Sequence, residues 1–147
     1  MGTKYKGSKK EKAALDAFIN LMRCANSLGS RLSNSYMDHN LTDSQFGVLE
    51  AIFHLGPLCQ KELAGKLLVT NGNMTMVIDN LEKGGLVERI RNKEDRRYFS
   101  INLTKNGRNL IQKIFPKHVE SIVEEFGSLT QTEQMQLREL CRKLGKK

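Results

Sequence analysis

The sequence predicts a mainly α-helical fold with one small two-stranded β-hairpin. Apolar residues recur at helical spacing in six separate segments, and their period changes to two only over residues 86–103. Aromatic residues make up 6% of the 147 positions and proline occurs twice, a composition that favours helices over a β-sandwich. A chain of this length is expected to form one domain, or two small lobes that share a core.

The first predicted helix carries apolar residues along two lines. One line follows the i, i+3, i+4, i+7 spacing of an amphipathic helix, and the other runs along a second side. Two apolar sides indicate that this helix packs against its own core and against a further surface, such as a partner chain. The first line is Leu15, Phe18, Ile19 and Met22, and the second is Ala14, Leu21 and Leu28.

Capping and turn residues delimit the second, third and fourth helices. Thr42 with Gln45 forms a capping box at the start of the second helix. The third is a short helix over residues 60–66. The turn Thr70–Gly72 can supply the N-cap of the fourth helix, and Gly84-Gly85 ends it. The residues expected to face inward are Phe46, Leu49, Ile52, Phe53, Leu63, Ala64, Leu67, Leu68, Met74, Val77, Ile78 and Leu81.

Residues 86–91 and 98–103 read as two strands, with Phe99, Ile101 and Leu103 on one side and a charged tip at 92–97 between them. The order of helix, short helix, turn, helix and hairpin describes a winged helix-turn-helix, in which the hairpin is the wing. Its recognition helix can enter the major groove of DNA, and the wing can reach a phosphate or the minor groove. Five basic residues within nine positions of the wing favour this function: Arg89, Arg91, Lys93, Arg96 and Arg97.

Two C-terminal helices complete the six. The fifth contains Pro116, where we expect a kink or a restart. Thr130 with Glu133 is a capping box that opens the sixth. The inward residues are expected to be Leu110, Ile111, Ile114, Phe115, Val119, Ile122, Val123 and Phe126 on the fifth helix and Leu137, Leu140, Cys141 and Leu144 on the sixth.

The exposed face of the fourth helix is the candidate base-reading surface. With its apolar residues buried, helical geometry places amides, a hydroxyl and a methionine on the opposite side, and these groups can contact bases. An ordinary solvated face is the alternative, because Lys83 is the only cation there and Asp79 would repel phosphate. The candidate contacts are Asn71, Asn73, Thr75, Met76 and Asn80.

Signatures of enzymes, metal sites and membrane spans are missing. The sequence has no glycine-rich nucleotide loop, nucleophile elbow or HExxH pattern, and its histidines lack the spacing of metal ligands. The three cysteines form no CxxC pair. No apolar run approaches the ~20 residues that a membrane span needs. We therefore expect a cytoplasmic protein that is not an enzyme, has no cofactor or metal and does not contact a membrane.

Three segments resemble the multiple antibiotic resistance regulator (MarR) family of bacterial transcription factors. They are LEKGGLVER at 81–89, DRR at 95–97 and LTKNG at 103–107, in the family's order and spacing. The resemblance implies a six-helix winged helix-turn-helix that forms an intertwined homodimer. It assigns residues 1–40 and 105–147 to dimerisation and residues 41–104 to the DNA-binding lobe. It also implies repression from a near-palindromic operator.

The family's Asp-x-Arg wing motif falls on Asp95 and Arg97. The resemblance implies that the arginine enters the minor groove and the aspartate orients the wing. The basic charge of the wing makes Arg91 and Arg96 further candidate contacts. From the residues alone, a plain surface ion pair is the alternative. The family often has a basic residue at the position of Met76, so the base preference is open. Gly107 and Thr104 are expected to be structural residues at a helix start.

The resemblance also implies release from DNA by a small aromatic or phenolic effector. Candidate pocket residues are Met22, Phe46, Leu49 and Phe53, although their helical spacing equally suits a core. Oxidation of Cys24 is a second possible signal, but no basic cluster beside it favours the thiolate. A winged-helix module that binds proteins without specific DNA binding is the alternative function.

The net charge of +8 lies at the two ends of the chain. Residues 1–12 hold five lysines and one glutamate, and residues 138–147 hold five basic residues and one glutamate, so each end carries +4. The 125 residues between them sum to zero, and the wing keeps a local excess of +2. The DNA-binding prediction therefore rests on the placement of charge at the wing and on the order of the motifs.

Overall fold

A computed structural model describes residues 3–67 and 69–146, and the predicted inward residue Leu68 lies outside them. The chain forms two compact units. We call residues 35–124 the winged unit, and Met1–Asn34 with Glu125–Lys147 the terminal unit. The division of the sequence into dimerisation and DNA-binding segments concerns a partner chain and DNA, and stays a prediction.

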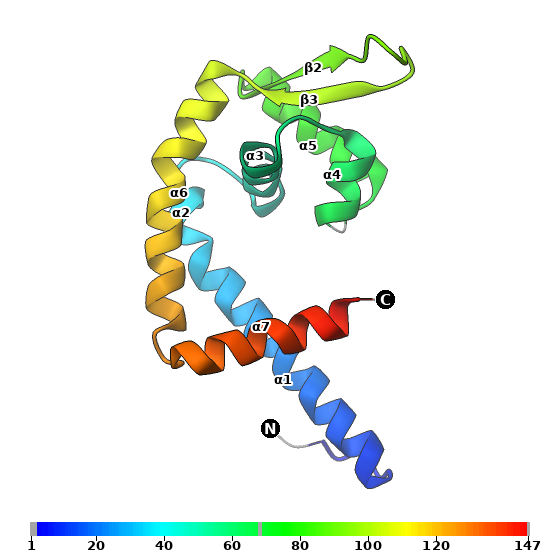
Figure 1. Cartoon of the computed structure of the whole chain (residues 1–147), viewed down its shortest axis with the longest axis vertical. Helices are drawn as coiled ribbons and strands as arrows, with labels where there is room; N and C mark the ends of the chain where they lie inside the picture. Colours follow the sequence, from blue (N-terminus) through cyan, green and yellow to red (C-terminus); the bar gives the residue numbers. More distant parts are fainter. Residues whose placement is uncertain (1–2, 68, 147) are drawn as a thin grey trace. The chain divides into compact units, whose positions relative to one another are not determined.

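The chain consists of helices and the strands of one small sheet (Figure 1). The predicted mainly helical fold is confirmed, with a one-turn helix, α2, in addition to the six predicted. The helices are α1 (Lys9–Leu32), α2 (Asn34–Met37), α3 (Asp43–Leu55), α4 (Gln60–Leu67), α5 (Asn71–Lys83), α6 (Lys105–Phe126) and α7 (Gln131–Gly145). The strands are β1 (Leu58–Cys59), β2 (Val87–Arg91) and β3 (Phe99–Leu103).

The sheet has three antiparallel strands in the order β1-β3-β2, one more than the predicted hairpin. The additional strand, β1, pairs Leu58 with Ile101 of β3. Two residues are too few to show an alternating pattern, so β1 leaves no signal in the sequence. Strands β2 and β3 with the residues between them form the wing, which extends beyond the helices of its unit (Figure 1).

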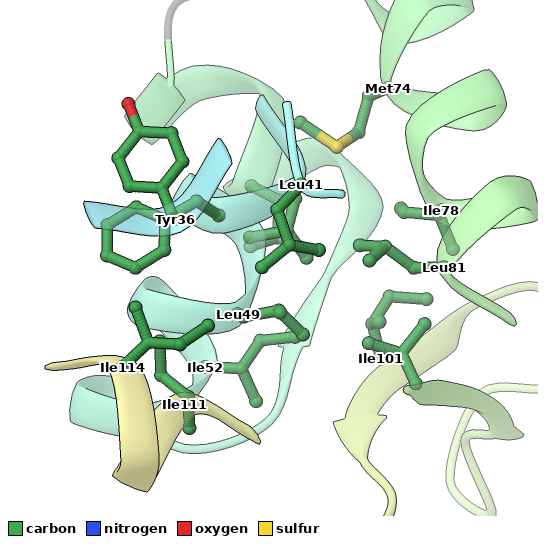
Figure 2. Close-up of a cluster of buried hydrophobic side chains, with 14 of the residues drawn as sticks. Tyr36, Leu41, Leu49, Ile52, Met74, Ile78, Leu81, Ile101, Ile111 and Ile114 are labelled. Atoms are coloured by element: carbon green, nitrogen blue, oxygen red, sulfur yellow. The ribbon is translucent and has the colours of Figure 1, made fainter. Parts of the chain in front are cut away.

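The core of the winged unit contains most of the residues predicted to face inward (Figure 2). Val48 is also fully buried, although it lies outside the predicted stripe. Phe99, Val119 and Val123 are exceptions in the other direction, with 38%, 39% and 65% of their surface exposed, so the expectation that they face inward is wrong for the single chain. The buried apolar residues are Tyr36, Leu41, Phe46, Val48, Leu49, Ile52, Leu63, Ala64, Met74, Ile78, Leu81, Val87, Ile101, Ile111 and Ile114.

The predicted helix starts are confirmed by their caps. Capping boxes are present at Thr42 of α3 and Thr130 of α7, and Thr70 accepts a hydrogen bond from the Asn73 N–H at the start of α5. A further capping box at Ser8 begins α1. Each cap satisfies backbone N–H groups that the first helical turn would leave unpaired.

Thr104 and Gly107 have the structural role that the sequence predicts. The Thr104 hydroxyl accepts from the Gly107 N–H at 3.0 Å and donates to the Gly85 carbonyl at 2.6 Å. Gly107 is buried, and a Cβ atom there would collide with the Leu86 carbonyl oxygen. Glycine at this position therefore lets α6 approach the end of α5. Helix α6 continues through Pro116 without a restart.

The terminal unit contains α1 and α7, and neither helix has a buried residue. Leu140 and Leu144 are 65% and 61% exposed, so the expectation that this face of α7 points inward is wrong for the single chain. Arg31 and Glu125 form a bidentate ion pair with two 2.8 Å contacts. No helix within the described residues is long and apolar enough to span a bilayer. An open groove is lined by Ala14, Ala17, Phe18, Leu21, Leu137, Leu140, Cys141 and Leu144.

Candidate nucleic-acid interface

Helix α5 separates an apolar face from a polar one. Met74, Ile78 and Leu81 are at most 1% exposed and anchor the helix in the core. Residues on the other side reach solvent, as expected for a helix that is amphipathic at a period of 3.6. The five residues predicted to contact DNA are all exposed: Asn71, Asn73, Thr75, Met76 and Asn80.

Gln60, the first residue of α4, ties the start of α4 to the start of α5. Its amide Nε2 donates to the Asn71 carbonyl at 3.1 Å and to the Thr75 hydroxyl at 2.6 Å. The Thr75 hydroxyl in turn donates to the same Asn71 carbonyl at 2.9 Å. This closed set of three hydrogen bonds fixes the first turns of α5 relative to α4.

Arg89 of β2 joins the wing to α5. Its guanidinium contacts the Asp79 carboxylate at 2.6 Å and the Glu82 carboxylate at 2.9 Å, and the Glu82 carboxylate also accepts from the Arg89 backbone N–H at 3.0 Å. The sequence pattern predicts that Arg89 is a cation available to DNA and that Asp79 repels phosphate. The structure pairs the two, so Arg89 connects the wing to the helix and reduces the repulsion from Asp79.

The tip of the wing is a closed turn. The Asn92 side-chain oxygen accepts from the backbone N–H groups of Glu94 at 2.9 Å and Asp95 at 3.3 Å. Backbone hydrogen bonds from Asn92 to the Tyr98 carbonyl and from Tyr98 to the Asp95 carbonyl complete it. An asparagine side chain that accepts from the N–H two residues ahead makes an Asx-type turn, which gives the charged tip a defined backbone.

Asp95 holds the Arg97 side chain at the wing tip. One carboxylate oxygen accepts from Arg97 Nε at 3.0 Å and the other from Nη2 at 2.9 Å. The first oxygen also accepts from the Arg97 backbone N–H at 3.1 Å. These bonds hold the pKa of Asp95 below its usual range and raise the pKa of Arg97. The Arg97 side chain is still 82% exposed, and its remaining N–H donors are available to a phosphate or base.

Three further cations surround the wing tip. The Arg91 guanidinium lies 4.8 Å from the centre of the Phe99 ring and donates to the Arg96 carbonyl at 3.1 Å. Within the described residues, Arg91, Lys93 and Arg96 form no ion pair with a carboxylate. Together with Asn92 they line a shallow depression. Cations that are not neutralised by protein carboxylates are the ones that can replace counterions on a phosphate backbone.

An open cleft lies between the starts of α4 and α5 and the wing. Gln60 and Asn71 line it from the helices, and Arg97 and Tyr98 line it from the wing. Cys59, a half-buried thiol of β1, lies in the same cleft. One predicted helix contact, Asn71, and one predicted wing contact, Arg97, therefore line the same cleft.

Comparison with known proteins agrees with this geometry. The family model described as "MarR family" matches residues 41–99. The HTH-type transcriptional regulator YkoM of Bacillus subtilis is 31% identical over 132 residues, which cover 90% of this chain and 86% of that protein. The chain belongs to the MarR family. It is therefore a helix-turn-helix transcriptional regulator and not an enzyme.

Two solved structures share the fold of this chain over most of its length. NadR in complex with 4-hydroxyphenylacetate has a TM-score of 0.78 at 24% identity, with 99% of each chain covered. BpsR of Bordetella bronchiseptica, whose DNA binding is regulated by 6-hydroxynicotinic acid, has a TM-score of 0.79 at 24% identity. That alignment covers 88% of this chain and 98% of BpsR.

The predicted effector residues of this MarR-family chain fall into both units. Phe46 and Leu49 are 4% and 0% exposed in the core of the winged unit. The Phe53 ring lies 6.2 Å from the Phe115 ring, and Phe53 is half-buried. Met22 is exposed on α1, as is Cys24. Their roles in sensing stay predictions. The described residues contain no group of three or more His, Cys, Asp or Glu placed to hold a metal ion.

Gln60 and the connecting role of Arg89 were not found from the sequence of this MarR-family chain. A glutamine at the start of a short helix gives no local signal that it contacts a hydroxyl 15 residues later. Arg89 lay within the predicted wing, but the spacing of Asp79 and Glu82 on one helical face was a usable sign that those carboxylates share a partner.

Proposed function

We propose that the chain is a repressor that binds a near-palindromic DNA operator as a homodimer and is released by a small aromatic or phenolic effector. The recognition helix α5 contacts bases through Asn71, Asn73, Thr75, Met76 and Asn80. The wing contacts the adjacent backbone and minor groove. As a bacterial regulator of cytoplasmic DNA, it acts in the cytoplasm.

One observation carries the DNA-binding part of this proposal. Asn71 at the start of α5 and Arg97 of the wing line one cleft from opposite sides. A helix that enters the major groove needs neighbouring groups that hold the flanking backbone. Arg97, oriented by Asp95, supplies positive charge in this cleft. Arg91 and Arg96 supply it in the depression at the wing tip.

Exposed apolar residues in the terminal unit support the homodimer. Phe18 is 60% exposed and Leu140 is 65% exposed, and both line the groove of α1 and α7. Apolar surface of this extent is usually covered in the working protein. A second copy of the chain is proposed to cover this apolar surface. Because a two-fold axis would then relate two recognition helices, the operator should have two-fold symmetry with half-sites about 34 Å apart.

Known relatives support the effector. The related structures contain or concern hydroxylated aromatic carboxylates, 4-hydroxyphenylacetate for NadR and 6-hydroxynicotinic acid for BpsR. We propose that Met22, Phe46, Leu49 and Phe53 contribute to the effector site. Oxidation of Cys24 is retained as the second candidate signal, because its thiol is exposed on α1.

The decisive experiment is selection of bound duplexes from a random pool with the full-length protein. A consensus with two-fold symmetry is expected, and its affinity should fall steeply as salt rises, because several phosphate contacts release counterions. Weak binding that is insensitive to salt, without an enriched sequence, would instead support a protein-interaction module. Addition of hydroxylated aromatic acids to the selected complex then tests release.

A further inference from the structure

The first turns of α5 expose an unusual chemistry for a DNA-reading surface. Thr75 and Met76 are exposed, and Met76 has 63% of its surface accessible. Neither side chain is charged. Amides lie beside them at Asn71 and Asn73, and recognition helices contact base edges with their N-terminal residues.

The Thr75 hydroxyl makes most of its hydrogen bonds within the protein. Its hydroxyl hydrogen goes to the Asn71 carbonyl at 2.9 Å, and its oxygen accepts from Gln60 Nε2 at 2.6 Å. A hydroxyl has only one hydrogen, so Thr75 has no donor to offer a base. Its oxygen keeps one unused lone pair, and its methyl is the apolar group that it offers to an external contact.

Gln60 makes this arrangement rigid. Both N–H bonds of its amide have acceptors, one in Asn71 and one in Thr75. Rotation of the Thr75 side chain to direct its hydroxyl at DNA would break the bond to Asn71 and the bond from Gln60 together. The loss of hydrogen bonds in a network makes that rotation costly.

Met76 adds a second apolar group to the same exposed face. Its thioether is polarizable and adapts to irregular surfaces. In the major groove, thymine alone among the four bases presents a methyl group, and apolar side chains contact it there.

We propose that Thr75 and Met76 form a methyl-reading surface that contacts the 5-methyl group of a thymine in each half-site, with Gln60 as the residue that positions Thr75. This inference rests on the proposed DNA-binding function and adds the chemistry of the base that is read. It predicts a preference for thymine within the half-site that comes from its methyl group and not from hydrogen bonding.

Uracil substitution tests the inference directly. In the selected duplex, each thymine of a half-site is replaced in turn by deoxyuridine, which keeps the base pair and removes only the methyl. At one or two positions the affinity should fall about fourfold, the value expected for one buried methyl group. Thymines outside these positions serve as internal controls.

Two matched variants assign the effect to Thr75. Thr75→Ser keeps the hydroxyl and its bonds to Gln60 and Asn71 but lacks the methyl, so the penalty for uracil should disappear at one position. Thr75→Val keeps a methyl but loses the bonds to Gln60 and Asn71 that position it, so that penalty should shrink without disappearing. Met76→Ala should abolish the penalty at a neighbouring position. Far-UV circular dichroism and thermal melting confirm that each variant is folded.

Two outcomes overturn the inference. One is uracil substitution that changes affinity less than about twofold at every thymine of the half-site. The other is a uracil penalty that persists unchanged in both Thr75→Ser and Met76→Ala. Both presuppose a selected duplex, so they differ from failure of the proposed function, in which no duplex is enriched at all.

Discussion

Arg97 shows how one side chain is prepared for DNA. Asp95 holds two of its N–H groups, and the rest of the guanidinium faces solvent. An exposed ion pair of this kind adds little to folding stability. The ion pair matters because it fixes the orientation of the Arg97 guanidinium.

Replacing Arg97 tests this contribution. Arg97→Ala should weaken operator binding about tenfold in a mobility-shift titration, in the range expected for loss of one DNA-contacting arginine. The folded protein should melt at an unchanged temperature. Lys113→Ala removes an exposed charge from α6 and serves as the control. Unchanged affinity of Arg97→Ala at moderate salt would remove the wing from the mechanism.

His118 is a second residue whose surroundings have a measurable consequence. It is 9% exposed, lies against the Phe46 ring at 4.8 Å, and has Ser35 Oγ 2.9 Å from Nδ1. Burial lowers the pKa of His118, and the charge of Glu50 opposes this shift only in part.

The pH dependence of stability follows from that shift. The unfolded chain binds a proton near the ordinary histidine pKa of about 6.5, and the folded chain binds it only at lower pH. The His118 contribution to stability is therefore complete above pH 6.5 and is lost as the pH falls from about 6.5 through the lowered pKa. Thermal melting between pH 8 and pH 5 should show a smaller slope for His118→Gln than for the parent. His39→Gln is the control, and an equal slope for His118→Gln and the parent would contradict the assignment.

At the scale of elements, the wing and α5 act as one part because Arg89 connects them. The Arg89 side chain is 22% exposed, and its two carboxylate partners are 47% and 43% exposed. Solvent weakens such pairs, so their effect on folding is modest. Their effect on the relative position of the two DNA-contacting elements is the larger consequence.

Arg89→Met should therefore separate binding from folding. We expect the operator affinity to fall about tenfold, while the free energy of unfolding changes by only about 1 kcal/mol. Arg89→Lys keeps the charge but not the fork that reaches both Asp79 and Glu82, and should be intermediate. Mobility shift and urea denaturation measure the two quantities. Loss of stability and affinity in equal proportion would argue for a purely structural role.

Gly107 links two elements by close packing. Gly107→Ala should destabilise the winged unit by about 2 kcal/mol or more, because the new methyl would collide with the Leu86 backbone. Gly65→Ala is the matched control, since its Cβ would meet nothing within 4 Å and alanine favours a helix interior. Urea denaturation compares them. Equal stability of the two variants would contradict the tight packing at Gly107.

Features of these elements that depend on local patterns could be predicted from the sequence, whereas contacts between distant residues could not. The α5 core residues and the Thr42 cap could be predicted because spacing and capping act within one or two turns. The Arg89 pair with Asp79 depends on how β2 returns along α5, and β1 exists only because β3 provides its partner. The placement of Asn71 and Arg97 along one cleft likewise required the folded structure.

At the scale of the whole molecule, the apolar face that contains Leu140 and Phe18 stays exposed in the single chain. Helical spacing groups these apolar residues on one face of each helix, but their burial depends on what covers that face, which no local pattern specifies. The two ends of the chain, which carry the excess positive charge, both belong to the terminal unit.

Disrupting that face tests the homodimer. Leu140→Glu should shift the protein from dimer to monomer in size-exclusion chromatography with light scattering, because a carboxylate in an apolar interface is strongly disfavoured. Operator affinity should fall at least tenfold, since one half-site alone would remain. Gln136→Glu adds the same charge on the flank of α7 and should stay dimeric. A parent protein that is monomeric at micromolar concentration would refute the dimer.

The bond between Asp95 and Arg97 also has a thermodynamic consequence. A free arginine side chain carries about 2 kcal/mol of rotamer entropy, which an arginine must lose when it is fixed against DNA. In this protein part of that loss has already occurred during folding, when Asp95 fixes the guanidinium. The entropy of association is then less unfavourable than for a mobile arginine making the same contact. The wing thus moves part of the ordering required for DNA binding into the folding of the protein.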